Sequence, residues 1–231
     1  MREIICDQGS AQWLQARVGK LTASRMVEVM SMLKKGGEGA DRRNYRIEII
    51  TERITERANE HYISRDMERG SELEPLARSA YEMAQQVLVE TAGFVLHPTL
   101  DYLGASPDGL VGNDGGMEIK CPRDTTHVRW LTDGIVPMEH RPQMYTNMLC
   151  CEREWWDFCS FSPYFKPFIV RLPRDEGEIR KIEEESARFN EEVEAGIRFL
   201  DPWILPKVVP FVDPRSAFEQ VYDLIGQEII P

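Results

Sequence analysis

Three charged side chains, Asp108, Glu118 and Lys120, lie in two short apolar runs of the sequence. The runs read DGLVG (108–112) and MEIKC (117–121), and a glycine-rich NDGG joins them. Side chains alternate along a strand, so Glu118 and Lys120 share one face while Ile119 points the other way. If the two runs pair as a hairpin, Asp108 lies opposite or close to the Glu118–Lys120 pair.

Two converging carboxylates repel each other unless a cation lies between them. Carboxylate oxygens and a backbone carbonyl suit Mg²⁺ or Mn²⁺, and Ile119 can supply the carbonyl while its side chain stays in the core. A metal held by Asp108 and Glu118 would polarise a phosphodiester and lower the pKa of a bound water. Lys120 would orient that water, act as its base or stabilise the developing charge. The alternative is a solvated hairpin with a surface Glu and Lys.

The surrounding pattern predicts the elements that position these residues. Ser10 is a plausible N-cap of a first short helix, and Thr22 or Ser24 of a second. Helical periodicity predicts further helices over 41–61, over about 68–86 despite Pro75, near 124–133 and 138–151, over 174–200 and over 216–226. Short β-branched or apolar runs predict a meander of strands over 87–122 and two more strands at 155–163 and 167–173. We therefore expect an α/β fold with a mixed central β-sheet flanked by helices.

Composition limits the classes of protein. The 231 residues carry a formal net charge of -11, which argues against a basic coat for nucleic acid but not against an enzyme with a local basic patch. No apolar run approaches the roughly 20 residues of a membrane span, and the N-terminal MREIICDQGS lacks a signal-peptide pattern. We expect a cytoplasmic protein without a membrane partner.

Cysteine and histidine spacing does not indicate a metal site. The five cysteines are an odd number without a CxxC pair, which argues against a disulfide framework and a zinc site. The histidines, at positions 61, 97, 127 and 140, show no HxH or HExxH spacing. Cys121 has no evident base partner, so we expect a packed thiol there.

The residues Pro107-Asp108 and Glu118-Ile119-Lys120 resemble the motif of the PD-(D/E)XK nuclease superfamily. Their surroundings resemble the phage lambda exonuclease-like family of alkaline exonucleases and viral recombination nucleases. The matching segments are QWLQARVGKLTAS (12–24), RGSELEPLAR (69–78), GASPDGL (104–110), GMEIKCP (116–122) and RPQMYTNML (141–149). The likeness covers roughly residues 8–200.

The resemblance implies a PD-(D/E)XK core and a processive 5′-to-3′ exonuclease. Such an enzyme digests one strand of linear double-stranded DNA from a 5′-phosphorylated end and leaves a 3′ overhang for strand annealing. It also implies two Mg²⁺ ions per site (Mn²⁺ as the alternative), a toroidal homotrimer, a single-strand annealing protein as partner, and a phage or prophage origin. The exonuclease domain would span 1–200, and 201–231 would be an extension packed on that domain or on a neighbouring subunit.

Carried over by position, the resemblance makes Asp108, Glu118 and the Ile119 carbonyl metal ligands and Lys120 the catalytic lysine. Glu74 matches a helix glutamate near the second metal. The alternative for Glu74 is a carboxylate that the helix dipole favours at the start of a helix.

The resemblance also implies a pocket for the 5′-phosphate, formed by Arg17, Ser24, Ser106 and Gln143. An Arg fork grips a phosphate with two hydrogen bonds, and hydroxyls and an amide can complete the cradle. Singly, the four could be a surface helix charge, a helix cap, a turn residue and a helix-surface amide. Trp13, one turn before Arg17, is expected in the core.

Two further positions match residues that separate the strands. Lys34 replaces a family arginine and lacks its planar fork, and Met67 lies where the family inserts an apolar wedge. Two other functions stay open: a structure- or site-specific DNA endonuclease or resolvase with the same core, and a DNA-binding or scaffolding module without activity. The complete Asp-Glu-Lys set argues against the last.

Overall fold

The computed structural model describes residues 1–31, 37–59 and 65–205, except for the side chain of Met67. The chain divides into two compact units, Met1–Ile197 and Arg198–Pro231. The first unit holds the candidate site. The helix expected over 216–226 and Lys34 lie outside the described residues.

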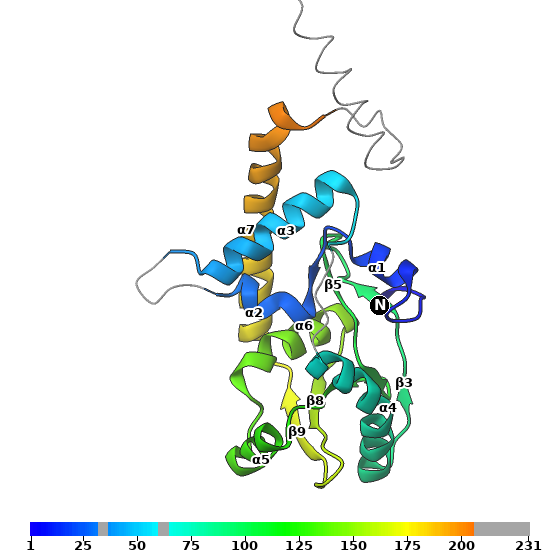
Figure 1. The fold of residues 1–231 in the computed structure, drawn as a ribbon. Helices are drawn as coiled ribbons and strands as arrows, with labels where there is room; N and C mark the ends of the chain where they lie inside the picture. Colours follow the sequence, from blue (N-terminus) through cyan, green and yellow to red (C-terminus); the bar gives the residue numbers. More distant parts are fainter. Residues whose placement is uncertain (32–36, 60–64, 206–231) are drawn as a thin grey trace, which may run out of the picture. The chain divides into compact units, whose positions relative to one another are not determined.

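The larger sheet is mixed, as the sequence predicts, and it carries the Asp-Glu-Lys hairpin. Figure 1 labels three of its strands, β3, β8 and β9. Its strand order is β3-β6-β7-β8-β9, formed by Val89–Glu90, Gly109–Val111, Gly115–Lys120, Trp155–Ser160 and Phe168–Pro173. β6 and β7 are antiparallel with Gly109 opposite Met117, whereas β7 and β8 run parallel. The parallel pair needs a long crossover, which α5 (Asp124–Asp133), η2 (Met138–His140) and α6 (Arg141–Cys151) supply.

A second, smaller sheet holds the segments that precede the hairpin. Its order is β1-β4-β5-β2, formed by Arg2–Ile4, Phe94–Leu96, Leu103–Ala105 and Leu21–Thr22. A single central sheet is thus too simple an expectation, because the predicted meander divides between two sheets. At Gly93 the backbone passes so close to β1 that a Cβ would lie 2.3 Å from the Ile4 carbonyl oxygen.

The remaining helices lie between these strands or after them in the chain order. They are α1 (Ala11–Arg17), η1 (Ala23–Arg25), α2 (Met26–Val29), α3 (Ala40–Thr55), α4 (Arg65–Gln85), α7 (Glu176–Leu200) and, in the second unit, η3 (Asp201–Trp203). Ser10 caps α1 as predicted, since its side chain accepts a 3.2 Å hydrogen bond from Trp13 N–H. α3 ends earlier than predicted, because Glu56 adopts a left-handed conformation (φ 57°). Pro75 lies inside α4, which begins ten residues before it.

The core behind the hairpin joins α4 to the larger sheet. Ala77 and Tyr81 of α4 pack with Met117 and Ile119 of β7, and Cys159 of β8 belongs to the same cluster. Strand alternation therefore holds as predicted: Met117 and Ile119 face the core, and Glu118 and Lys120 lie on the other face. Within the described residues, no helix has the length and apolar character needed to cross a membrane.

Candidate active site

The β6–β7 hairpin brings Asp108, Glu118 and Lys120 together. Asp108 Oδ2 accepts a 2.6 Å hydrogen bond from the Ile119 N–H, and Lys120 Nζ lies 2.6 Å from Glu118 Oε1. Glu118 is fully buried. The solvated-hairpin alternative does not agree with this burial, because a surface Glu–Lys pair would be exposed.

The electrostatics of the hairpin favour a bound cation. Burial, and then the charge of Glu118, hold the pKa of Asp108 well above its usual range. Burial lowers the pKa of Lys120, but the charges of Glu118 and Asp108 outweigh that effect and raise it. A divalent cation would relieve the repulsion between the two carboxylates.

The Ile119 carbonyl has the direction that a metal ligand needs. The carbonyl of the next residue, Lys120, accepts a 2.9 Å hydrogen bond from Phe161 N–H on the β8 side. Peptide groups alternate in direction along a strand, so the Ile119 carbonyl points to the opposite side, where Asp108 lies. The donor set therefore fits Mg²⁺ or Mn²⁺, which prefer carboxylate and carbonyl oxygens.

Glu74 lines the same cavity from α4, and its charge is among those that raise the pKa of Asp108. Because α4 begins at Arg65, Glu74 lies in the helix interior, and the helix-start alternative for this residue is wrong. Arg78, one turn later, donates a 3.3 Å hydrogen bond to Glu74 Oε1. The carboxylate is thus held at the cavity but not buried.

All the predicted site residues that the structure describes with their side chains line one cavity of about 450 Å³. It is lined by the hairpin residues, Glu74 and the four residues of the predicted phosphate pocket, Arg17, Ser24, Ser106 and Gln143. The sheet topology explains why Ser24 and Ser106 lie close together: β2 and β5 run parallel, with Thr22 opposite Gly104. Ser24 and Ser106 shortly follow the carboxyl ends of these strands, and parallel strands end at the same edge of a sheet.

Arg17 is partly buried against Ser106 and Trp13. Its Nη1 donates a 3.0 Å hydrogen bond to Ser106 Oγ, and its guanidinium lies 4.0 Å from the centroid of the Trp13 ring. Trp13 Nε1 also donates to Ser106 Oγ, at 2.8 Å. The expectation that Trp13 belongs to the core is therefore wrong. Trp13 precedes Arg17 by four residues, and residues with this spacing share a helix face. This spacing could have indicated that Trp13 lies beside Arg17 at the cavity.

Ser24 and Gln143 complete the group. Thr22 is the N-cap residue of η1, as one of the two expected caps, but its hydroxyl forms no capping hydrogen bond. Arg25, and not Ser24, is the N-cap of α2. The Ser24 hydroxyl faces the cavity and lies 3.4 Å from Thr22 Oγ1. Gln143 Oε1 lies 3.4 Å from Lys120 Nζ, so this amide bridges the phosphate pocket and the hairpin.

Two residues outside the sequence-based predictions, Asn147 and Gln8, support the hairpin. The buried Asn147 donates a 3.0 Å hydrogen bond from Nδ2 to Glu118 Oε2, and its position one turn after Gln143 on α6 was the available signal. Gln8 donates a 2.8 Å hydrogen bond to the carbonyl of Pro107, next to Asp108. Burial raises the pKa of Cys121 to about 11, in agreement with a packed thiol.

The two predicted strand-separating residues stay predictions. Lys34 lies outside the described residues. Met67 belongs to α4, but the structure does not describe its side chain.

Comparison with known proteins shows which family the chain resembles. A family model described as the YqaJ-like viral recombinase domain matches residues 12–154. Two structures of the alkaline exonuclease LHK-Exo from Laribacter hongkongensis, one of them in complex with dAMP, are similar to this chain. The dAMP complex is 39% identical with a TM-score of 0.78, and the other structure is 40% identical with a TM-score of 0.77. Each match covers 84% of this chain and 97% of the other.

A phage-related exonuclease from Haemophilus somnus 129PT is 15% identical, with a TM-score of 0.60, over 78% of this chain and 96% of the other. At that identity the likeness shows the fold alone. A search of curated proteins gave no match.

Proposed function

Because the chain belongs to the YqaJ-like viral recombinase family and is a nuclease with the PD-(D/E)XK fold, we propose that it digests linear double-stranded DNA from 5′-phosphorylated ends. It works in the 5′-to-3′ direction, depends on Mg²⁺ (or Mn²⁺) and leaves a 3′ single-stranded overhang for recombination by strand annealing. LHK-Exo, at 39% identity, is an alkaline exonuclease, which supports digestion from an end.

One observation carries the proposal: a site suited to an end phosphate and a site suited to metal ions share one cavity. Arg17 forms no ion pair with a carboxylate in the described part of the chain, although Trp13 and Ser106 hold its guanidinium in place. An arginine that is fixed but not neutralised is ready to bind a phosphate. An endonuclease would not need an end-phosphate site beside its scissile site.

The residues of the cavity divide the work. Asp108, Glu118 and the Ile119 carbonyl would hold one metal, with Glu74 near a second. The metals would supply Lewis-acid polarisation of the phosphodiester and a water of lowered pKa. Asn147 keeps Glu118 oriented, and the ammonium of Lys120 stabilises the charge that develops on the phosphate or orients the attacking water.

The proposed polarity rests on the 5′-phosphate as the group that the phosphate site binds. An end phosphate bound by Arg17, Ser24, Ser106 and Gln143 leaves the next phosphodiester toward Lys120. Hydrolysis then releases the end nucleotide and leaves a new 5′-phosphate on the shortened strand. The new end can bind in the same way, which accounts for stepwise digestion.

The test uses linear duplex DNA labelled separately on each strand, with one 5′-phosphorylated and one 5′-hydroxyl end, and Mg²⁺. We expect loss of the phosphorylated strand from its 5′ end while the other strand stays whole. Internal nicks would instead support an endonuclease or resolvase, and digestion from the 3′ end would contradict the polarity.

We also propose the assembly and context that the family resemblance implies. Three copies enclose the duplex, a single-strand annealing protein receives the 3′ overhang, and the enzyme acts in the cytoplasm of a bacterial host. Residues 201–231 pack on the exonuclease domain or on a neighbouring subunit. Light scattering should give about three times 26.7 kDa, and a monomer at micromolar concentration would contradict the ring.

A further inference from the structure

Residues 18–23 connect Arg17 to Ser24, two of the residues proposed to bind the end phosphate. We propose that α3 positions this phosphate site by holding the connecting segment at both ends, through Tyr45, Glu52 and Arg53. The inference rests on the proposed function. It makes these three residues positioning residues that determine the preference for a 5′-phosphate, without contact with DNA.

The first anchor holds the peptide groups of Gly19. Glu52 Oε2 accepts a 2.8 Å hydrogen bond from Gly19 N–H, and Arg53 Nε donates one of 2.8 Å to the Gly19 carbonyl. Gly19 has a left-handed conformation (φ +69°), and a Cβ there would lie 2.7 Å from Arg53 Cγ. Two consecutive side chains of α3 therefore fix the backbone two residues after Arg17, at a position that requires glycine.

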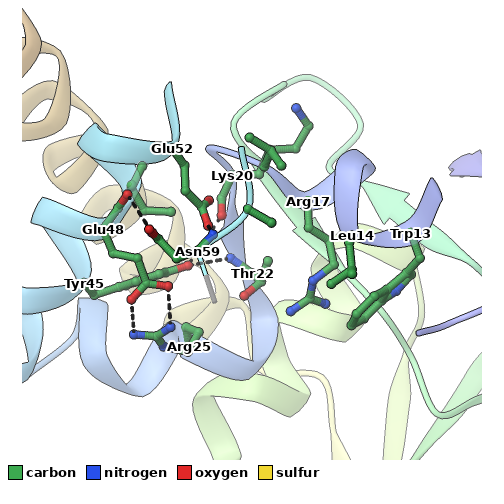
Figure 2. Close-up of a pocket in the computed structure, with 13 residues that line it drawn as sticks. Trp13, Leu14, Arg17, Lys20, Thr22, Arg25, Tyr45, Glu48, Glu52 and Asn59 are labelled. Atoms are coloured by element: carbon green, nitrogen blue, oxygen red, sulfur yellow. Dashed lines mark hydrogen bonds and ion pairs between the residues drawn. The ribbon is translucent and has the colours of Figure 1, made fainter. Parts of the chain in front are cut away.

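The second anchor lies at the other end of the segment, two residues before Ser24. Thr22 N–H donates a 3.1 Å hydrogen bond to the hydroxyl of Tyr45, whose side chain is buried (Figure 2). Arg25 lies over the Tyr45 ring at 4.2 Å and forms ion pairs with Glu28 and Glu48. The chain is thus attached to α3 on both sides of Ser24, through the backbone of Thr22 before it and through the side chain of Arg25 after it.

Arg17 depends on these anchors because a cavity, and not a core of buried side chains, adjoins α1 on the side of α3. A cavity of about 400 Å³ lies between them, lined by Trp13, Leu14 and Arg17 on one side and by Tyr45, Glu48 and Glu52 on the other (Figure 2). None of the residues of α1 is fully buried. Because no packed core fixes Arg17 on that side, its position depends on Ser106, Trp13 and the backbone that leads to Gly19.

α3 is in turn held by ion pairs and hydrogen bonds to α7. Its buried Arg42 pairs with Glu192 of α7 at 2.9 Å, and Arg46 pairs with the same carboxylate at 2.9 Å. Arg53, besides its bond to Gly19, contacts Glu194 and Asn190 of α7 at 2.6 and 2.7 Å. A linked set of polar contacts therefore runs from α7 through α3 to the segment beside Arg17.

Tyr45→Phe tests the inference without a change of charge. The substitution leaves the Thr22 N–H without its partner and keeps the ring that packs under Arg25. Tyr81→Phe is the matched control, since it removes another buried hydroxyl, which donates a 2.8 Å hydrogen bond to Asp157, away from the phosphate site. The measurement is kcat/KM on duplexes with 5′-phosphate ends divided by kcat/KM on duplexes with 5′-hydroxyl ends, together with the thermal midpoint of each protein.

We expect Tyr45→Phe to lower this ratio by about tenfold through a higher KM for phosphorylated ends, because small displacements of a binding group are costly. The rate on hydroxyl ends should stay within about twofold. Tyr81→Phe should lower the thermal midpoint at least as much and leave the ratio unchanged. Gly19→Ala, which forces Arg53 away, should lower the ratio in the same way as Tyr45→Phe.

An unchanged ratio in both Tyr45→Phe and Gly19→Ala would overturn the inference while the proposed phosphate site stands. An equal decrease of the ratio in Tyr81→Phe would also overturn the inference, because loss of any buried hydroxyl would then lower the ratio through reduced stability of the protein. If the wild-type protein itself has no preference for a 5′-phosphate, the proposed phosphate site fails, and the inference fails with it.

Discussion

The amide N–H of Ile119 donates a 2.6 Å hydrogen bond to Oδ2 of Asp108. This bond lies beyond the last paired residues of β6 and β7, so the carboxylate continues the hairpin where the backbone pairing has ended. It also fixes one oxygen of Asp108 next to the peptide whose carbonyl is proposed to bind the metal. The site thus combines structural and chemical roles in one side chain.

Lys120→Ala should reduce cleavage to a small residual rate and leave DNA binding nearly unchanged. The ammonium stabilises the reacting phosphate, and loss of one such group typically costs about 10²–10³-fold in kcat. The measurement pairs single-turnover cleavage with Mg²⁺ and a binding assay with Ca²⁺ in its place. Normal cleavage by this variant would contradict the assigned role of Lys120.

Arg17→Lys should lose most of the preference for 5′-phosphorylated ends although it keeps the charge. A lysine cannot form the two parallel hydrogen bonds of a guanidinium or stack on Trp13 in the same way. The readout is the ratio of kcat/KM on phosphate and hydroxyl ends. Arg2→Lys, at an exposed ion pair with Asp101, is the control and should keep the wild-type ratio.

Asn147→Leu should raise the Mg²⁺ concentration needed for half-maximal activity by about 10–100-fold, as loss of a residue that orients a metal ligand typically does. The variant removes the hydrogen bond that orients Glu118 Oε2, and the Glu118 carboxylate itself is retained as a ligand. Isothermal titration with Mn²⁺ gives an activity-independent readout. Wild-type metal affinity in a folded variant would show that Asn147 does not orient Glu118.

His140→Phe should make the protein less sensitive to acid. Burial, and then the charge of Lys120, lower the pKa of His140 from 6.5 to about 4. A group with a lowered pKa in the folded state contributes stability that is present above its unfolded pKa and lost as pH falls toward the folded pKa. As the pH falls from 6.5 to about 4, the free energy of unfolding of the wild-type protein should therefore decrease by up to about 3 kcal/mol through this residue.

Phenylalanine keeps the stacking on Phe158, whose ring centroid lies 5.4 Å from that of His140, and does not titrate. Urea unfolding at pH 7, 6, 5 and 4 measures the effect. The free energy of unfolding of the variant should fall less steeply with decreasing pH. Parallel curves for the two proteins would show that His140 titrates alike in the folded and unfolded states.

The sequence by itself determined the hairpin and the charged side chains that meet on it. Asp108, Glu118 and Lys120 lie within a short stretch where strand alternation and one turn decide which side chains meet, so local rules are sufficient. The mixed sheet and the positions of most helices followed from periodicity in the same way. The residues of the phosphate site came from the family resemblance, since no local rule joins positions as distant as Arg17 and Ser106.

Tertiary structure alone decided the rest, because those features depend on residues far apart in the chain. Arg17 and Ser106, 89 residues apart, meet only when β2 pairs with β5, and the same pairing exposes Trp13 to the cavity. Local cap propensity could not show that Thr22 bonds to Tyr45 through its backbone, nor that Glu52 and Arg53 hold Gly19. Hydrogen bonds of this kind leave no periodic pattern in the sequence, and only the packing of α3 beside the segment 18–23 brings the partners together.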